Sequence, residues 1–173
     1  TCAQVFYGLL SHMINVYGMR TESEMPEVYK DFIRHEGAPT YLRRDNAQAQ
    51  KSKKVTAINR ELLIGDQYTE PHHPQQNPAE LQAVKFLKDH SQVIMDRTGA
   101  DEKAWFDCCE YVADVHNICA NDLLNGRTPI EKRHGYTPDI SAYLLFTFWE
   151  DVLYLDAEES FPSTKEKRAT FLN

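Results

Sequence analysis

The sequence lacks the features that mark membrane, secreted and disulfide-stabilised proteins. No apolar run approaches the roughly 20 residues of a transmembrane helix, so we expect no membrane span and no membrane partner. The first ten residues, TCAQVFYGLL, contain no Met and no basic residue, which argues against a signal peptide. The four cysteines have no C-x-x-C spacing, so we expect no disulfide framework and a reducing compartment.

The composition is nevertheless that of an ordinary folded domain. The chain has 173 residues, of which 42% are hydrophobic and 26% are charged, and this is enough for one domain with a core. Its first residues, CAQVFYG, combine β-branched and aromatic side chains as strands do. Because the chain opens directly on a strand, we expect it to be a fragment of a longer protein.

The net charge of -7 argues at first against a nucleic-acid partner, but the charge is unevenly distributed. Residues 1–90 contain 11 basic and 11 acidic residues, whereas residues 91–173 contain 8 and 15. Around Asp45 the chain is locally basic, with Arg43, Arg44, Lys51, Lys53, Lys54 and Arg60. On charge alone a solvated helix face is the simpler interpretation. A basic patch beside one carboxylate would also suit a site that handles phosphates.

Hydrophobic periodicity and turn residues predict alternating strands and helices. Strands are expected at 2–8, 13–20, 39–42 and 66–71, and helices at 21–37, 51–65, 78–98 and 102–121. Ser23 is the expected cap of the first helix, and Gly37, Gly65 and Gly99 are expected to end the first three. The order β-β-α-β-α-β-α-α predicts an α/β fold, a mixed sheet with helices on its faces. We expect a core over 1–125 and an extension over 126–173, whose last dozen residues form a linker or frayed tail.

Glu80 opens the third helix in the stretch PHHPQQNPAELQAVK and has two possible roles. Asn77 suits the N-cap and Pro78 the first helical position, so Glu80 completes a capping box. On a helical projection, however, Glu80 shares its face with an apolar stripe that includes Val84 and Leu87. The polar loop before it is also longer than a cap requires, so a functional role for the carboxylate stays open.

Asp45 is equally ambiguous, because Asp-Asn after a strand is ordinary turn chemistry. A position just past the carboxyl end of a strand is also where open α/β sheets bind ligands. Two carboxylates are too few for a two-metal site, which would need a third. The adjacent His72 and His73 have no partner at ligand spacing, which argues against zinc, and Cys108, Cys109 and Cys119 suit core packing.

Taken together, these motifs resemble the integrase catalytic core of retroviruses and LTR retrotransposons. The segments D-N-A (45–47) and P-Q-Q-N-P-A-E (74–80) place 34 residues between Asp45 and Glu80. The segments G-A-P-T-x-L-x-x-D-N-A (37–47), T-P-x-E (128–131) and G-x-x-P-D-I-S (135–141) are similar to copia-type polyproteins in particular. The resemblance extends from about Cys2 to Tyr154.

The resemblance implies an RNase H-like fold and a DDE-type polynucleotidyl transferase that carries out DNA 3′-end processing and strand transfer. Three acidic residues of that family hold two Mg²⁺ or Mn²⁺ ions, and Asp45 matches the second acid and Glu80 the third. The first acid has no match, because no acidic residue precedes Glu22. We therefore expect a fragment that lacks the family's first strand and is inactive by itself.

The resemblance also implies partners and contacts. DNA, as element ends and target duplex, is the expected partner, in a homo-oligomer that acts in the nucleus after a cytoplasmic particle stage. The residues expected to contact DNA are Arg43, Arg44, Lys51, Lys53, Lys54, Gln75, Gln76, Asn77, Lys85 and Lys88. The aromatic segment 143–154 suits either an interface or, more simply, a core.

Three alternatives remain open on the sequence. The missing first acid also suits a non-catalytic DNA-binding or assembly module derived from an integrase. An RNase H-type nuclease would use the same fold and the same ions. A purely structural α/β module would bind neither metal nor DNA.

Overall fold

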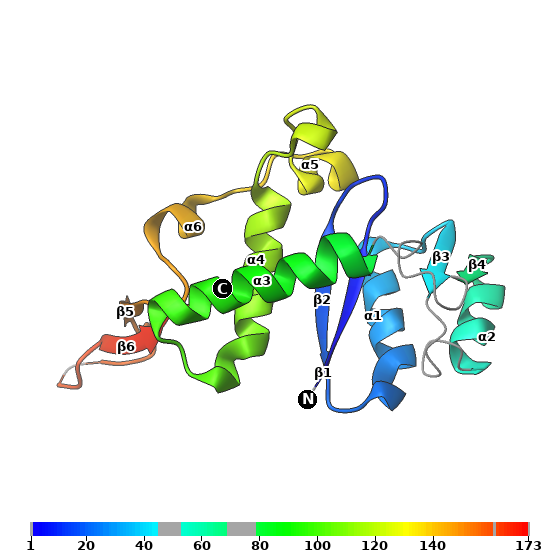
Figure 1. The fold of residues 1–173 in the computed structure, drawn as a ribbon. Coiled ribbons are helices and arrows are strands. Elements are labelled where there is room, and N and C mark those ends of the chain that lie inside the picture. Colours follow the sequence, from blue (N-terminus) through cyan, green and yellow to red (C-terminus); the bar gives the residue numbers. More distant parts are fainter. Residues whose placement is uncertain (1, 45–52, 69–78, 161, 173) are drawn as a thin grey trace. The chain divides into compact units, whose positions relative to one another are not determined.

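The computed structural model describes residues 2–44, 53–68, 79–160 and 162–172 (Figure 1). The chain divides into two compact units, Thr1–Phe86 and Leu87–Asn173. Parallel and antiparallel strand pairs both occur, which confirms the α/β class. Within the described ranges the strands pair in twos and do not form one continuous sheet. Among the helices described, none combines the length and the apolar character needed to cross a membrane.

The first unit begins with the predicted hairpin of β1 (Cys2–Tyr7) and β2 (Ile14–Met19). The strands are antiparallel, and Tyr7 pairs with Ile14 at the turn. The turn is tight: the His12 N–H donates to the Gly8 carbonyl at 2.7 Å, and His12 adopts a left-handed φ of 58°. The last residue of β1 is thereby fixed beside the turn.

The predicted first helix is present as η1 (Glu22–Glu24) followed by α1 (Met25–Glu36). Gly37 ends it with a φ of 84°, as expected from a residue without a Cβ. The expected cap was wrong: Ser23 bonds to the hydroxyl of Thr21 at 2.7 Å, and the residue at the N-cap makes no side-chain cap bond.

A parallel pair of short strands follows, β3 (Tyr41–Arg44) and β4 (Gly65–Tyr68), connected through α2 (Lys53–Glu61). We expected a helix over 51–65 that ends at Gly65, and this limit is wrong, because α2 ends at Glu61. Leu63 takes a left-handed φ of 55° and is 91% exposed, whereas Ile64 is buried in its place. The turn at Leu63 directs the chain into β4.

One hydrophobic core holds the elements of the first unit together. Phe6 of β1 stacks on Phe32 of α1 with ring centroids 4.2 Å apart, and Val55 of α2 is fully buried. The buried members of the core are Phe6, Met19, Met25, Val28, Tyr29, Val55, Ile58 and Ile64. Both helices therefore share one core with β1, β2 and β3.

The predicted third helix is continuous but changes character along its length. Its first six residues form a π-helix, η3 (Ala79–Val84), and the rest forms α3 (Lys85–Thr98), which ends at Gly99 with a φ of 68°. Periodicity predicted the helix but not its π-helical start. Ala83 is fully buried, and η3 packs against β1 within the first unit.

The second unit is built on the predicted helix α4 (Trp105–Ile118), preceded by η4 (Glu102–Ala104). Cys108 is fully buried and its thiol donates to the Ser91 carbonyl of α3 at 3.6 Å, so the expected packing role is confirmed for this cysteine. For Cys119 that expectation is wrong, because Cys119 is exposed at the end of α4.

The last part of the chain is more structured than expected. Its elements are η5 (Asp122–Leu124), α5 (Pro129–His134), α6 (Ser141–Leu145), β5 (Asp151–Leu155) and β6 (Glu166–Thr170). The expectation of a frayed tail is wrong, because β6 pairs antiparallel with β5. In the aromatic segment Phe148 is 1% exposed, as the core role predicts, whereas Tyr154 is 50% exposed.

The cysteines should differ in reactivity. Burial raises the pKa of the Cys108 thiol to about 11, whereas Cys119 is exposed, and the thiolate is the reactive form. We expect iodoacetamide at mildly alkaline pH to modify Cys119 well before Cys108, as followed by peptide mass mapping. Denatured protein, in which both should react, is the control. Equal rates in the native protein would contradict the buried position of Cys108.

Candidate functional site

The two predicted metal ligands are attached to elements of the same unit. Asp45 directly follows Arg44, the last residue of β3, and itself lies outside the described residues. Glu80 is the second residue of η3, where the structure describes its backbone but not its side chain. Among the side chains that are described, no group of three or more His, Cys, Asp or Glu residues could hold a metal ion.

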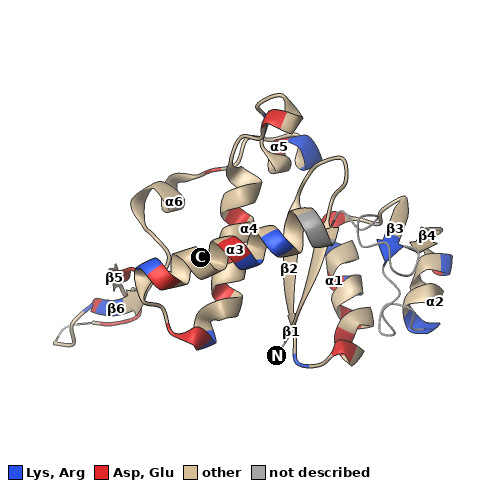
Figure 2. Ribbon diagram, in the orientation of Figure 1, with Lys and Arg blue, Asp and Glu red and all other residues tan. Residues whose placement is uncertain are grey.

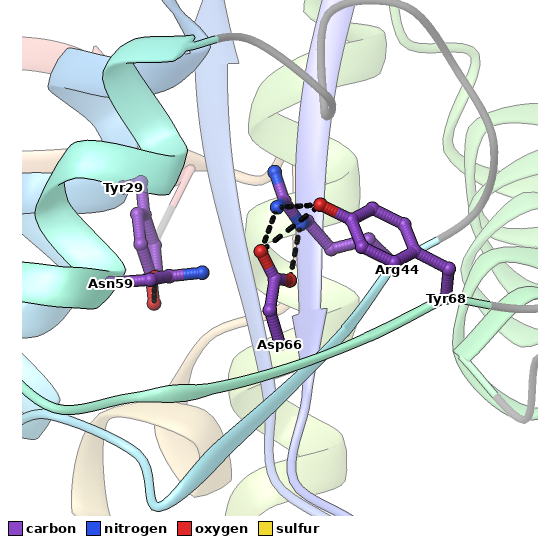
Figure 3. A network of polar contacts seen from close by, with 5 residues as sticks. All are labelled: Tyr29, Arg44, Asn59, Asp66 and Tyr68. Carbon is purple, nitrogen blue, oxygen red and sulfur yellow. Dashed lines mark hydrogen bonds and ion pairs between the residues drawn. The ribbon is translucent and has the colours of Figure 1, made fainter.

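The end of β3 is held by a polar network (Figure 3). The Arg44 guanidinium forms a bidentate ion pair with Asp66 of β4, in which Nε donates to Oδ1 at 3.0 Å and Nη2 to Oδ2. Nη2 also donates to the Tyr68 hydroxyl at 2.7 Å, and that hydroxyl donates to Asp66 Oδ2 at 3.0 Å. The carboxyl ends of two adjacent parallel strands are therefore fastened to each other.

Strand alternation explains why Arg44 turns inward. In the parallel register Leu42 pairs with Asp66 and Arg44 with Tyr68, so these side chains share one face of the strand pair. Leu42 packs against the hydrophobic core on that face. Arg43 points to the other face, where it donates to Gln67 at 3.2 Å.

The expectation that Arg44 belongs to an exposed DNA-binding patch is therefore wrong. Arg44 is 2% exposed, and its guanidinium is bonded to Asp66 and Tyr68. A phosphate could reach it only by displacing Asp66 from a largely buried position. The residue before Asp45 serves to hold the strand.

A second buried polar contact lies in the same core. The Tyr29 hydroxyl of α1 donates to Asn59 Oδ1 of α2 at 2.9 Å, which ties the two helices together (Figure 3). Burial raises the pKa of Tyr29 to about 12, against the opposing effect of the Arg44 charge. Tyr29 therefore remains a hydrogen-bond donor throughout the neutral pH range.

The other predicted DNA contacts fall into two groups. Five of them are exposed on described elements, on β3, at the start of α2 and at the start of α3: Arg43, Lys53, Lys54, Lys85 and Lys88 (Figure 2). Four lie outside the described residues: Lys51, Gln75, Gln76 and Asn77. The exposed set borders the two stretches that contain Asp45 and Glu80 in the sequence.

Sequence reasoning missed two sets of residues near the candidate ligands. Asp66 and Tyr68 could have been found, because they alternate on β4 in step with Leu42 and Arg44 on β3. The hydrogen bond from the Tyr7 hydroxyl to Gln82 Oε1, at 2.6 Å, joins residues 75 positions apart and left no local signal in the sequence.

Removing either partner of the Arg44–Asp66 ion pair should destabilise the fold, but by different amounts. We expect Asp66→Ala to lower the free energy of unfolding by about 3–5 kcal/mol, because it leaves a buried guanidinium without its counter-charge. Arg44→Met should cost less, because Asp66 retains 21% side-chain exposure and water can solvate it. Urea denaturation measures both values.

The matched control is Asp31→Ala, which removes the exposed Arg34–Asp31 pair of α1, 2.9 Å in length. A change of about 1 kcal/mol or less is expected there, because exposed pairs contribute little. Equal losses for Asp66→Ala and Asp31→Ala would show that the Arg44 pair is not held in the core.

Comparison with known proteins gives matches among solved structures. The HTLV-2 integrase catalytic core domain in complex with magnesium, in its trimeric form, aligns with a TM-score of 0.63 at 15% identity, over 77% of this chain and 84% of that chain. Its dimeric form aligns with a TM-score of 0.56 at 14% identity, over 77% and 83%. No protein-family model and no curated protein matches the chain.

A third match is a chain of the simian T-cell lymphotropic virus intasome in complex with PP2A regulatory subunit B56 gamma. It aligns with a TM-score of 0.62 at 17% identity, over 95% of this chain and 61% of that chain. Identities this low establish the fold alone. The chain therefore has the fold of a retroviral integrase catalytic core, which confirms the RNase H-like prediction.

Proposed function

We propose that this chain is part of a DNA integrase core, of the kind encoded by copia-like LTR retrotransposons. Its reaction class is polynucleotidyl transfer, as 3′-end processing and strand transfer on DNA. One observation supports this most: on an integrase-core fold, Asp45 directly follows the carboxyl end of β3 and Glu80 opens the helix after β4. These are the two acids that the sequence motifs single out.

The two carboxylates are the right type of ligand for divalent metal ions, but they are too few for a two-metal site. Carboxylate oxygens are the ligands that Mg²⁺ and Mn²⁺ prefer, and Asp45 and Glu80 would both hold the ions. When bound, a metal pair activates a water or a DNA 3′-hydroxyl and stabilises the in-line displacement at phosphorus. Two carboxylates do not complete such a site, and no acid precedes Glu22. We infer that residues 1–173 alone are not catalytically active.

The chain's own exposed cations would position DNA. Arg43, Lys53, Lys54, Lys85 and Lys88 are exposed on described elements, and phosphate contacts of this kind fix orientation and contribute most of the affinity. Lys51, Gln75, Gln76 and Asn77 are assigned the same role by their place beside Asp45 and Glu80 in the sequence. Arg44 is left out of the proposed contacts because it is buried.

The proposal extends to assembly and location. The HTLV-2 cores are described in dimeric and trimeric forms and the simian virus protein in an intasome, which supports a homo-oligomer acting on DNA here. Action in the nucleus, after residence in a cytoplasmic particle, follows from the same function.

A non-catalytic DNA-binding or assembly module is the second candidate. The absence of an acid before Glu22 favours it. It predicts DNA binding that needs no divalent metal and does not change in Glu80→Gln. An RNase H-type nuclease shares the fold and the ions, and it would cleave RNA–DNA hybrids where an integrase joins DNA strands.

Metal binding distinguishes the catalytic from the non-catalytic proposal. We expect Asp45→Asn and Glu80→Gln each to weaken Mn²⁺ binding by more than roughly tenfold, since even the outer-shell partners of a metal site are worth about 10- to 100-fold. Electron paramagnetic resonance of free Mn²⁺ measures the affinity. Asp31→Asn on α1 is the control and should leave it unchanged. Mn²⁺ affinity that is the same in all four proteins would refute the metal site.

DNA binding should depend on the lysines of α2. We expect the double variant Lys53→Gln, Lys54→Gln to reduce the slope of log affinity against log salt by about 1.8, or about 0.9 for each lost phosphate contact. Fluorescence anisotropy with a short DNA duplex measures the slope. Lys30→Gln is the control, because Lys30 lies on α1 and pairs with Glu27 at 3.2 Å. An unchanged slope in the double variant would place the DNA elsewhere.

A further inference from the structure

Three side chains form a hydrogen-bonded chain between the β1–β2 turn and η3. The Tyr7 hydroxyl donates to Gln82 Oε1 at 2.6 Å and lies 3.0 Å from Nδ1 of His12. A hydroxyl has one hydrogen and two lone pairs, so its donation to Gln82 leaves it to accept from the His12 N–H. The chain therefore runs from His12 through Tyr7 to Gln82, and all three members belong to the first unit.

The hairpin end of this chain is firmly held. Tyr7 is the last residue of β1 and pairs with Ile14, which is 1% exposed. The His12 ring meets the Tyr7 ring edge-on, with centroids 5.8 Å apart. Burial raises the pKa of Tyr7, so its hydroxyl stays protonated and able to donate near neutral pH. The hydroxyl is thus a donor in a fixed place.

The other end lies in the π-helical turn that contains Glu80. Gln82 is the fourth residue of η3, two positions after Glu80, and the next residue, Ala83, is fully buried. A π-helix closes i→i+5 bonds where an α-helix closes i→i+4 bonds, and it occurs mostly as short insertions within α-helices, frequently at functional sites. A change from π to α register would rotate the first residues of η3 relative to α3. A contact that fixes Gln82 therefore fixes the position from which Glu80 projects.

We propose that Tyr7 is a positioning residue for the metal ligand Glu80. By holding Gln82, Tyr7 keeps η3 in its π-helical register and sets the place of Glu80 relative to the end of β3. The inference rests on the proposed function in one respect only, the role of Glu80 as a ligand. The register of η3 can be tested without metal.

The first experiment compares Tyr7→Phe with Tyr17→Phe in metal-free protein. Tyr7→Phe removes only the hydroxyl, and with it the bonds to Gln82 and His12. Tyr17 lies on the other strand of the same hairpin, and its hydroxyl has no hydrogen-bond partner among the described residues. We expect backbone amides of 79–84 to exchange with solvent about fivefold faster in Tyr7→Phe and at the original rate in Tyr17→Phe, given the modest net contribution of one neutral hydrogen bond. Equal exchange in the two variants would overturn the proposal.

The second experiment measures Mn²⁺ affinity in the same proteins. Tyr7→Phe and Gln82→Leu should each weaken Mn²⁺ binding by about fivefold, and the double variant should lose no more than either single one, because both remove the same bond. Tyr17→Phe should bind Mn²⁺ as the original protein does. A merely structural role would change stability and leave the Mn²⁺ affinity unaltered.

The two experiments separate failure of the inference from failure of the proposed function. If Asp45→Asn weakens Mn²⁺ binding but Tyr7→Phe does not, the metal site stands and Tyr7 does not position it. If no variant alters Mn²⁺ binding, the proposed metal site fails. In that case, faster hydrogen exchange of the 79–84 amides in Tyr7→Phe would still show that Tyr7 holds η3 in place. Unchanged exchange would refute that role of Tyr7 too.

Discussion

The first unit depends on a buried ion pair between two short parallel strands. Strands β3 and β4 each have four residues, and their backbone bonds alone give little cooperativity. A buried guanidinium is costly unless a counter-charge faces it, and Arg44 meets the Asp66 carboxylate and the Tyr68 hydroxyl only in this register. If β4 slipped by one residue along β3, Asp66 and Tyr68 would face the other side of the strand pair. The charge of Arg44 would then stay in the core without its partners. The ion pair thus fixes both the register and the point at which β3 ends.

The two proposed metal ligands lie close in the sequence to residues that are held in place. Asp45 comes directly after the residue that the ion pair holds, and Glu80 lies two residues before Gln82, which Tyr7 holds. Each proposed ligand is therefore within two residues of a side chain that bonds to a different element of the same unit. Sites that must hold metal ions within a fraction of an ångström need such supports, because a ligand on an unsupported turn is too loosely placed.

The sequence predicted those helices and strands whose ends depend only on neighbouring residues. β-Branched and aromatic side chains predicted β1 and β2, and Gly37 and Gly99 ended their helices, because a left-handed residue is a local requirement. The failures were non-local. Leu63 fits a helical stripe, but the chain turns there so that Ile64 can reach the core. The sequence of β6 has the composition of a polar tail, and it forms a strand because it pairs with β5. The sequence around Arg44 is that of a surface cation, and Arg44 is buried because Asp66 lies opposite it. The two acids stand out as motifs in the sequence, whereas the Tyr7–Gln82 hydrogen bond left no local signal there.

The most direct test of the account is a crystal structure of this chain grown with Mn²⁺, with the ions located by anomalous scattering. The account predicts an ion with carboxylate oxygens of Asp45 and Glu80 at about 2.1 Å, the distance typical of small divalent cations. An ion bound elsewhere, with Glu80 bonded only to the first turn of its own helix, would contradict it. In that case Glu80 is a helix cap, and the chain keeps the integrase fold without the integrase site.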